Sequence, residues 1–273
     1  MSLLQAGNGV LLLILIVATR LPSILFQSMQ PYSDPFTAIH PNDDMYDSPA
    51  KAYYYLYGYE AAELVEKFGG LEKVTGRPPS ILDYPCGFGR VMRHLRKQYP
   101  SARILGADIN RAGVGFCGST FGAIPVNAPS SPADFKLGEL FDVIFCGSLL
   151  THFAEPLWDE LLDFFQRHLL ERGRVIFTTT GRHSAAWLRS GSGSKGLGIS
   201  DEILGPILAD YDATGFGYRD YTEGTGYGAA ISHPEWVLAK VLSKPGWRLV
   251  HAAEQAWGSN QDVFVLEKIP EAV

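Results

Sequence analysis

Residues 81–91, with the sequence Ile-Leu-Asp-Tyr-Pro-Cys-Gly-Phe-Gly-Arg-Val, place two glycines between an apolar run and an amphipathic segment. Gly87 and Gly89 let the backbone take positive φ and come close to a ligand. A second apolar run ends at Asp108, about twenty residues further on. A doubly wound sheet binds a nucleoside with this order of strand, glycine turn, helix, strand and acid, and the acid takes the ribose hydroxyls. The motif therefore predicts an α/β protein with a nucleoside site.

The segments around this motif alternate regularly between strand and helix. We expect strands at 81–84, 103–107, 123–126, 141–146 and 174–179, and helices at 90–98, 112–121 and 156–170. A last helix at 234–242 precedes strands at 247–252 and 262–267. The link between these two strands is too short for a right-handed helical crossover, so the last strand should enter antiparallel. The prediction is a doubly wound, seven-stranded Rossmann-like sheet, mostly parallel with an antiparallel last strand.

The chain divides into a lead-in and one domain. Residues 1–47 form an N-terminal apolar segment and an irregular lead-in, and 48–273 form the domain, which begins with a tyrosine-rich helix at 48–68. The alternation stops at about 181–232, where glycines separate short aromatic pieces. Long interruptions of a regular scaffold are commonly lids or binding inserts. We therefore expect an insert there that serves binding.

Composition limits the classes of function. A net charge of -6 argues against extensive contact with nucleic acid. The three cysteines form no paired framework, and no Cys or His spacing suggests a metal site, so we expect a cytoplasmic protein without a metal. The cations Arg90, Arg93, Arg96 and Lys97 recur at helical spacing, which favours one solvated helix face.

Residues 10–18 are unbroken apolar residues, about half of what spans a bilayer. No Lys or Arg precedes them, which argues against a secretory signal. Three interpretations stay open: membrane contact by residues 10–26, a helix packed on the domain, or translation that starts at Met29. We favour the last two.

The motifs and their order resemble the class I S-adenosylmethionine-dependent methyltransferases over about residues 48–268. Asp83-Tyr-Pro-Cys-Gly-Phe-Gly-Arg resembles the first motif of that family, although Pro85 stands where a glycine is usual. Asp108 corresponds to the acid after the second strand, and residues 141–152 resemble the fourth-strand motif. The resemblance implies S-adenosylmethionine as cofactor. The residues expected to bind it are Tyr54, Gly58, Asp83, Pro85, Cys86, Gly87, Gly89, Asp108, Ile109, Cys146, Gly147 and Ser148.

The residues themselves favour the same cofactor. S-adenosylmethionine has no phosphate, and no Lys or Arg lies between Asp83 and Gly89. A dinucleotide would prefer a third glycine where Met92 stands. Two rival interpretations remain: a nicotinamide-dependent oxidoreductase of similar fold, and a non-catalytic cofactor-binding interaction module.

One histidine follows the fourth strand directly. His152 is placed to deprotonate an acceptor, although a helix-capping or structural role competes with that interpretation. His183 is a second, weaker candidate. The expected function is methyl transfer to a small or medium-sized acceptor, on an oxygen or nitrogen nucleophile of a metabolite or glycan. The aromatic residues expected to shape the acceptor pocket are Trp187, Tyr218, Tyr221 and Tyr227.

Overall fold

A computed structural model describes residues 35–46, 51–191 and 200–270. Contacts divide the chain into two units, Met1–Ala38 and Ile39–Val273. The first unit is described only over its last residues, which form the short 3-10 helix η1 (Pro35–Thr37). None of the described helices is long and apolar enough to cross a bilayer. The segment 10–26 lies outside the described residues, and so does the start of the expected helix at 48–68.

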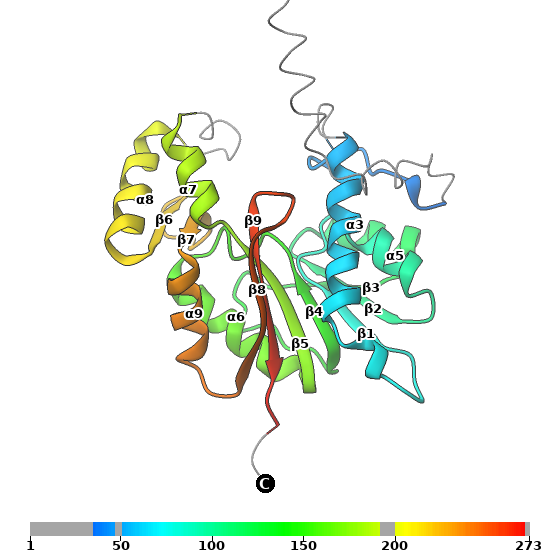
Figure 1. Ribbon diagram of the computed structural model, residues 1–273. Coiled ribbons are helices and arrows are strands. Elements are labelled where there is room, and N and C mark those ends of the chain that lie inside the picture. Colours follow the sequence, from blue (N-terminus) through cyan, green and yellow to red (C-terminus); the bar gives the residue numbers. More distant parts are fainter. Residues whose placement is uncertain (1–34, 47–50, 192–199, 271–273) are drawn as a thin grey trace, which may run out of the picture. The chain divides into compact units, whose positions relative to one another are not determined.

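A seven-stranded sheet with the order β3-β2-β1-β4-β5-β9-β8 forms the centre of the second unit (Figure 1). The pairs from β3 to β5 are parallel, and β9 is antiparallel to both of its neighbours. This confirms the predicted fold class. The strands are β1 (Ser80–Asp83), β2 (Arg103–Asp108), β3 (Ile124–Asn127), β4 (Phe141–Cys146), β5 (Leu169–Thr179), β8 (Trp247–Trp257) and β9 (Gln261–Lys268).

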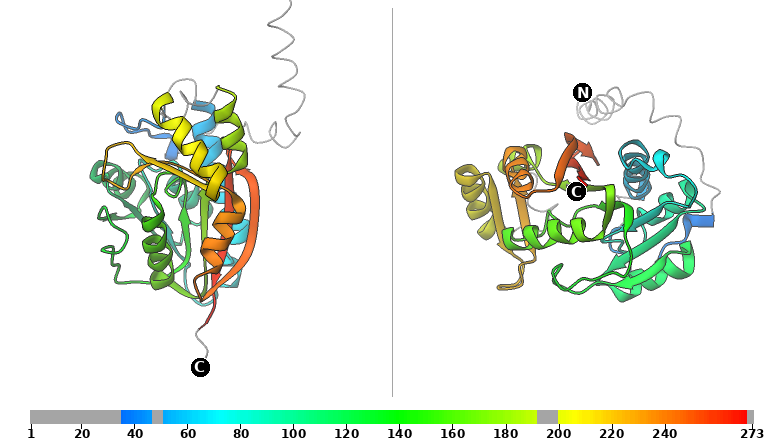
Figure 2. Two further views of the ribbon diagram at one scale, coloured as in Figure 1. Left: turned by 90° about the vertical axis from the view of Figure 1, so that its left-hand side faces the viewer. Right: turned by 90° about the horizontal axis from the view of Figure 1, so that it is seen from below.

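Helices cover both faces of this sheet, as the view from below in Figure 2 shows. The connections β1-α4-β2 and β4-α6-β5 cross the sheet in opposite directions from its centre, and right-handed crossovers then place α4 and α6 on opposite faces. Helix α3 contacts α4, and α4 contacts α5. The helices are α3 (Lys51–Phe68), α4 (Met92–Gln98), α5 (Arg111–Phe121), α6 (Glu155–His168) and α9 (Pro234–Leu242), with the short 3-10 helix η3 (Leu71–Lys73) after α3.

The core lies between the sheet and these helices. β4 buries every residue except Asp142, which is half-buried, as its continuous apolar sequence predicts for a central parallel strand. On one face, Phe164 of α6 stacks on Phe135 with a centroid distance of 4.9 Å, and Trp158 is fully buried. Large aromatic side chains of this kind supply much of the apolar area that a domain buries. The sheet is therefore held rigidly, and its edges present fixed positions for functional groups.

The segment between β5 and α9 forms a small lobe of its own. It contains α7 (Arg182–Arg189), α8 (Asp201–Thr214) and the two-stranded antiparallel sheet of β6 (Phe216–Asp220) and β7 (Gly228–Ser232). Figure 1 shows this lobe beside the carboxyl end of β5. Its own apolar cluster consists of Ala185, Leu188, Ile207, Tyr211, Ala229 and Ile231.

The structure corrects the expected solvated face of the helix after the glycine turn. Arg93 is only 2% exposed. Its guanidinium lies 5.2 Å from the ring centroid of Tyr54 and 5.0 Å from that of Phe121. A cation is excluded from an apolar interior unless aromatic faces or hydrogen bonds replace its water, and here both do. Periodicity identified the helix correctly but gave the wrong environment for this residue.

Candidate active site

The carboxyl ends of β1, β2 and β4 meet at one edge of the sheet, because these strands are parallel neighbours. Asp83 ends β1, Asp108 ends β2 and Cys146 ends β4. The glycine turn, residues 84–91, follows β1 at this edge. Ligands of open α/β sheets bind at this position, where the strand order reverses beside the first strand. The structure thus brings the predicted residues of three separate segments together.

Asp108 holds the glycine turn directly. Its Oδ2 accepts a hydrogen bond of 2.8 Å from the amide of Gly87, and its Oδ1 accepts one of 2.8 Å from the amide of Asn110. Gly87 has a φ of 49°, and a Cβ added there would meet nothing within 4 Å. Gly89 has a φ of 84°, and a Cβ there would lie 2.4 Å from the ring of Phe121. One glycine thus keeps space open, and the other permits close packing.

Asp83 carries a buried oxygen that no described residue satisfies. The residue is 1% exposed, and its Oδ2 has no hydrogen-bond partner among the described residues. Burial, and then the charge of Asp108, raise the pKa of Asp83 well above its ordinary range, while the charge of Arg90 opposes this. A buried acceptor without a partner is costly, so this oxygen is suited to a hydrogen-bond donor of a ligand, above all a cationic one.

Arg90 is a site residue that sequence analysis assigned to the solvated face. Burial lowers its pKa, whereas the nearby acidic groups Tyr54, Asp43 and Asp83 raise it. Its guanidinium lies 5.3 Å from the ring centroid of Trp257, the last residue of β8. The one available signal in the sequence was its position directly after the second glycine of the turn.

Tyr54 and Gly58 lie behind the turn. The hydroxyl of Tyr54 donates to Asp43 Oδ2 at 2.6 Å and accepts from the Nη2 of Arg93 at 3.2 Å. The Nε of Arg93 in turn donates to the carbonyl oxygen of Gly89 at 3.1 Å. A Cβ on Gly58 would lie 2.1 Å from the carbonyl oxygen of Arg90. Both residues therefore fix α3 and the segment 39–46 against the turn.

The end of β4 is held by side chains of β5 and β9. The amide of Ser148, which has a φ of 58°, donates to Thr178 Oγ1 at 2.8 Å. Gln261 Nε2 donates to Ser148 Oγ at 2.8 Å. A Cβ on Gly147 would lie 2.8 Å from the ring of Phe145. Cys146 is fully buried, so its side chain is not available to a ligand.

The remaining predicted cofactor residues differ in exposure. Ile109, which follows β2, is 65% exposed although it is apolar. Cys86 is buried, and its Sγ lies 3.6 Å from the carbonyl oxygen of Gly87. Pro85 is half-buried, and its peptide bond with Tyr84 is cis. Of these three, Ile109 alone offers a wide apolar surface at the edge of the sheet.

His152 is fixed in one tautomer by the β6–β7 hairpin. Its Nδ1 lies 2.9 Å from the carbonyl oxygen of Gly228. A carbonyl oxygen only accepts, so Nδ1 carries the hydrogen and Nε2 keeps its lone pair in the neutral ring. Burial lowers the pKa of His152, which favours this neutral form. The ring stacks on Tyr227 at a centroid distance of 5.1 Å, and the hydroxyl of Tyr221 lies 3.2 Å from Nδ1.

Tyr227 belongs to this aromatic cluster through His152 and Tyr221. Burial, and then the charges of Asp108 and Asp44, raise its pKa. The other predicted pocket residues belong to two elements of the small lobe, β6 and α7. Tyr218 packs against the main core and donates from its hydroxyl to Asp220, and Trp187 and His183 belong to α7. No group of His, Cys, Asp and Glu suited to hold a metal occurs within 35–46, 51–191 and 200–270.

Comparisons with known proteins agree with this geometry. The sequence matches the methyltransferase domain family over residues 53–201. Among solved structures, an S-adenosylmethionine-dependent methyltransferase from Clostridium acetobutylicum aligns with a TM-score of 0.54 and 16% identity, covering 83% of this chain and 97% of that chain. An O-methyltransferase family 2 protein from Planctomyces limnophilus, in complex with apigenin, aligns with a TM-score of 0.53 and 16% identity. The alignment covers 81% of this chain and 60% of that chain. The glycopeptide N-methyltransferase MtfA, complexed with S-adenosylmethionine, aligns with a TM-score of 0.51 and 11% identity. The alignment covers 78% of this chain and 87% of that chain.

At these identities the structural matches show the fold. For two other aligned structures, the chain spans only 54% and 60% of their length. A search of curated proteins finds no match to the sequence. The family match covers more than half of the chain, and the aligned methyltransferases share its fold. The chain therefore belongs to the methyltransferase domain family and has the Rossmann-like fold of the aligned S-adenosylmethionine-dependent methyltransferases.

Proposed function

We propose that this enzyme methylates an oxygen or nitrogen nucleophile on a small or medium-sized acceptor, a metabolite or a glycan. The observation that carries this proposal is the neutral His152, held in a fixed tautomer within an aromatic cluster at the carboxyl edge. Two aligned structures support small acceptors in general, since one contains apigenin and the other is a glycopeptide N-methyltransferase.

The glycine turn and its neighbours fit S-adenosylmethionine, which supplies a methyl group on a sulfonium when it is bound. The unsatisfied Oδ2 of Asp83 suits the amino group of the cofactor, and the open side of Gly87 leaves room for it. Asp108 would accept hydrogen bonds from the ribose hydroxyls, and the exposed side chain of Ile109 would lie against the adenine. Other backbone groups of the two loops would complete the site; they belong to Pro85, Cys86, Gly89, Cys146, Gly147 and Ser148.

Tyr54 and Gly58 would act through the turn. The chain of hydrogen bonds from Asp43 through Tyr54 and Arg93 ends on the carbonyl oxygen of Gly89. Gly58 lets α3 approach the carbonyl oxygen of Arg90. These contacts support a positioning role, in which both residues fix the turn in its binding conformation.

His152 would take the proton that the acceptor loses. With Nδ1 committed to Gly228, only Nε2 is available to accept a proton from a hydroxyl or an amine. Its partners Tyr221 and Tyr227 are 43% and 44% exposed and offer flat faces to a ring-shaped acceptor. Holding the acceptor in line with the methyl group would contribute more than the base does, up to about 7–11 kcal/mol.

The expected extent of the domain, 48–273 with an insert at 181–232, is part of the proposal. Residues 152–154 support a binding role for the insert, because their backbone pairs with residues 226–228 of the hairpin. A cytoplasmic location is likewise proposed, since Cys86, Cys117 and Cys146 are buried as free thiols, which suits a reducing compartment.

The test is transfer of labelled methyl groups from S-adenosylmethionine to a panel of phenols, amino sugars and amines, with wild type and His152→Gln. We expect turnover on at least one acceptor and a loss of about 10²–10⁴-fold in kcat in the variant. The affinity for S-adenosylhomocysteine should stay within about twofold, because His152 would contact the acceptor and not the cofactor. His251→Gln, at a half-buried histidine that stacks on Phe68, is the control. Equal activity of the two variants would remove His152 from the proposal.

A further inference from the structure

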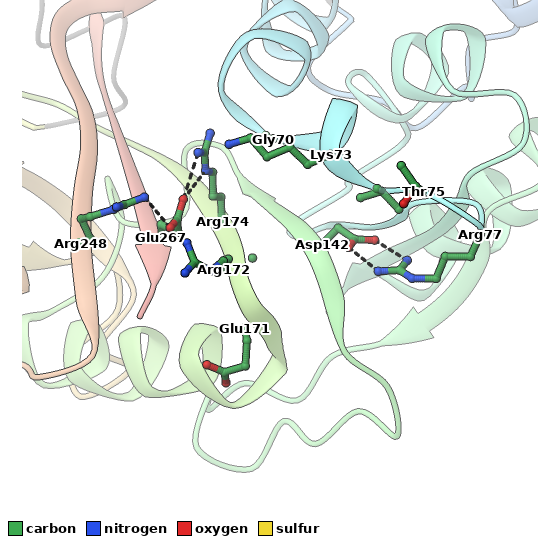
Figure 3. Close-up of a pocket in the computed structure, with 13 residues that line it drawn as sticks. Gly70, Lys73, Thr75, Arg77, Asp142, Glu171, Arg172, Arg174, Arg248 and Glu267 are labelled. Carbon is green, nitrogen blue, oxygen red and sulfur yellow. Dashed lines mark hydrogen bonds and ion pairs between the residues drawn. The ribbon is translucent and has the colours of Figure 1, made fainter. Parts of the chain in front are cut away.

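A hollow lies at the opposite edge of the sheet (Figure 3). Its volume is about 370 Å³. We call it the amino-edge cleft; its lining consists of Gly69, Gly70, Lys73, Val74, Thr75, Arg77, Asp142, residues 171–174, Arg248 and Glu267. These residues precede β1 or belong to the amino ends of β4, β5 and β8 and the carboxyl end of the antiparallel β9. The cleft is therefore separate from the methyl-transfer site.

The cleft is positively charged although the protein is acidic. Five cationic side chains line it against three carboxylates, a surplus of two positive charges. The whole chain, by contrast, has a net charge of -6. One of these carboxylates, Glu171, pairs at 3.0 Å with Lys268, a cation outside the lining. An isolated basic hollow on an acidic protein concentrates anions locally.

Part of this charge is held in place by the fold. Arg174 and Arg248 share the single carboxylate of Glu267, at 3.0 and 2.6 Å. The side chain of Arg174 is 12% exposed, and its Nη1 also donates to the carbonyl oxygen of Phe68 at 2.8 Å. Two guanidinium groups on one carboxylate leave a positive charge without compensation. These two arginines thus form a preorganised cationic wall.

Two further cations are available to a ligand. The guanidinium of Arg172 makes no hydrogen bond or ion pair with any residue in the described part of the chain, and its φ of 65° is unusual outside glycine. The Nζ of Lys73 lies 4.0 Å from Glu72, and its side chain is 69% exposed. Figure 3 shows Arg172 and Lys73 on the two sides of Arg174. Neither cation is needed to neutralise a carboxylate of the cleft.

We propose that the amino-edge cleft binds a small polyanion of the diphosphate or triphosphate class. Planar guanidinium groups match phosphate oxygens in geometry, and the fixed pair Arg174–Arg248 offers that geometry without further ordering. Arg172 and Lys73 would close on the outer phosphate groups. The cleft has the volume of a small-ligand site, and the acidity of the rest of the protein disfavours a long nucleic acid chain.

The test is calorimetric titration of the full chain with inorganic triphosphate at low ionic strength. We expect saturable binding of one ligand per chain, and about tenfold weaker binding in both Arg172→Asn and Lys73→Gln. Asparagine is chosen because it tolerates the left-handed conformation of residue 172. Arg103→Gln is the matched control, because Arg103 is an exposed arginine at the start of β2, paired with Glu139 and outside the cleft. It should bind triphosphate as wild type does.

Titration with orthophosphate tests whether the site requires several linked phosphate groups or attracts any anion. Orthophosphate should bind at least about tenfold more weakly than triphosphate. The proposal is overturned by an absence of saturable binding at millimolar triphosphate, by equal affinity for orthophosphate, or by an equal loss in Arg103→Gln. The affinity for S-adenosylhomocysteine, measured on the same samples, shows that each variant is folded.

Discussion

The carboxylate of Asp108 accepts a hydrogen bond of 2.8 Å from the backbone amide of Gly87, which lies 21 residues earlier in the chain. This bond ties the end of β2 to the turn that follows β1. The turn is thereby held in one conformation before a ligand arrives, which lowers the entropy cost of binding. The acid thus supports the shape of the turn in addition to the ribose contact proposed for it.

Asp108→Asn should weaken the binding of S-adenosylhomocysteine by about tenfold or more, because a charged acceptor is replaced by a neutral one that accepts at a single oxygen. Calorimetric titration measures this. Asp134→Asn, at an exposed carboxylate, is the control and should have no effect. Unchanged affinity in Asp108→Asn would show that this acid holds only the turn.

Gly58→Ala should destabilise the fold by about 2–4 kcal/mol, since the new Cβ would lie 2.1 Å from the carbonyl oxygen of Arg90 and force α3 away from the turn. Gly115→Ala is the matched control on another helix, at an exposed position where a Cβ meets nothing within 4 Å. It should stabilise by about 0.5–1 kcal/mol. Urea unfolding monitored by circular dichroism compares the two. Similar effects of both changes would contradict the close approach of α3.

The sheet could be predicted from the sequence because each strand has a local signal. The apolar run at 141–146 coincides with β4, and the short link before the last strand excluded a parallel entry. Strand bounds were less exact: β8 continues to Trp257 instead of ending near 252, because its pairing with β9 extends to Trp257 and Gln261. Pairing across a sheet extends strands through residues whose own sequence signal is weak.

The environment of single side chains could not be predicted in the same way. Arg93 is buried by Tyr54, which comes from a helix 39 residues earlier, and His152 is fixed by Gly228, 76 residues later. The amino-edge cleft likewise unites Lys73 with Arg248 and Glu267. Helical periodicity shows which residues share a face, but only the tertiary fold decides what covers that face.

Arg93→Lys should be markedly destabilising, by about 2–4 kcal/mol, although it conserves the charge. The lysine side chain cannot stack a planar group on Tyr54 and Phe121 while it also reaches the carbonyl oxygen of Gly89. Chemical unfolding measures the difference. Lys67→Arg, on the exposed surface of α3, is the reverse exchange and should be nearly neutral. A stable Arg93→Lys protein would mean that charge alone matters at this position.

The pH dependence of turnover should report the base. Burial lowers the pKa of His152 below its ordinary value of 6.5, so the ring stays neutral and able to accept a proton at pH 7. We expect kcat/KM to be constant above neutrality and to fall only as the pH drops through this lowered pKa. The acid limb should disappear in His152→Gln and persist in His251→Gln. An acid limb that persists in His152→Gln would assign it to another group.

Asp262 should make the protein less stable as the pH rises. It is fully buried, its Oδ2 has no partner among the described residues, and burial raises its pKa from 3.8 to about 6. The folded state therefore holds this proton more tightly than the unfolded state does. The stabilisation is complete below pH 3.8 and is lost as the pH rises through about 6.

Asp262→Asn removes this titration and keeps an oxygen for the hydrogen bond that Asp262 Oδ1 accepts from the amide of Gln255 at 3.0 Å. Relative to wild type, the variant should gain about 2–3 kcal/mol between pH 4 and pH 7. Urea unfolding at several pH values measures this gain, with Asp134→Asn as the exposed control. A constant difference between Asp262→Asn and wild type across this range would show that the carboxyl group has the same pKa in the folded and unfolded states.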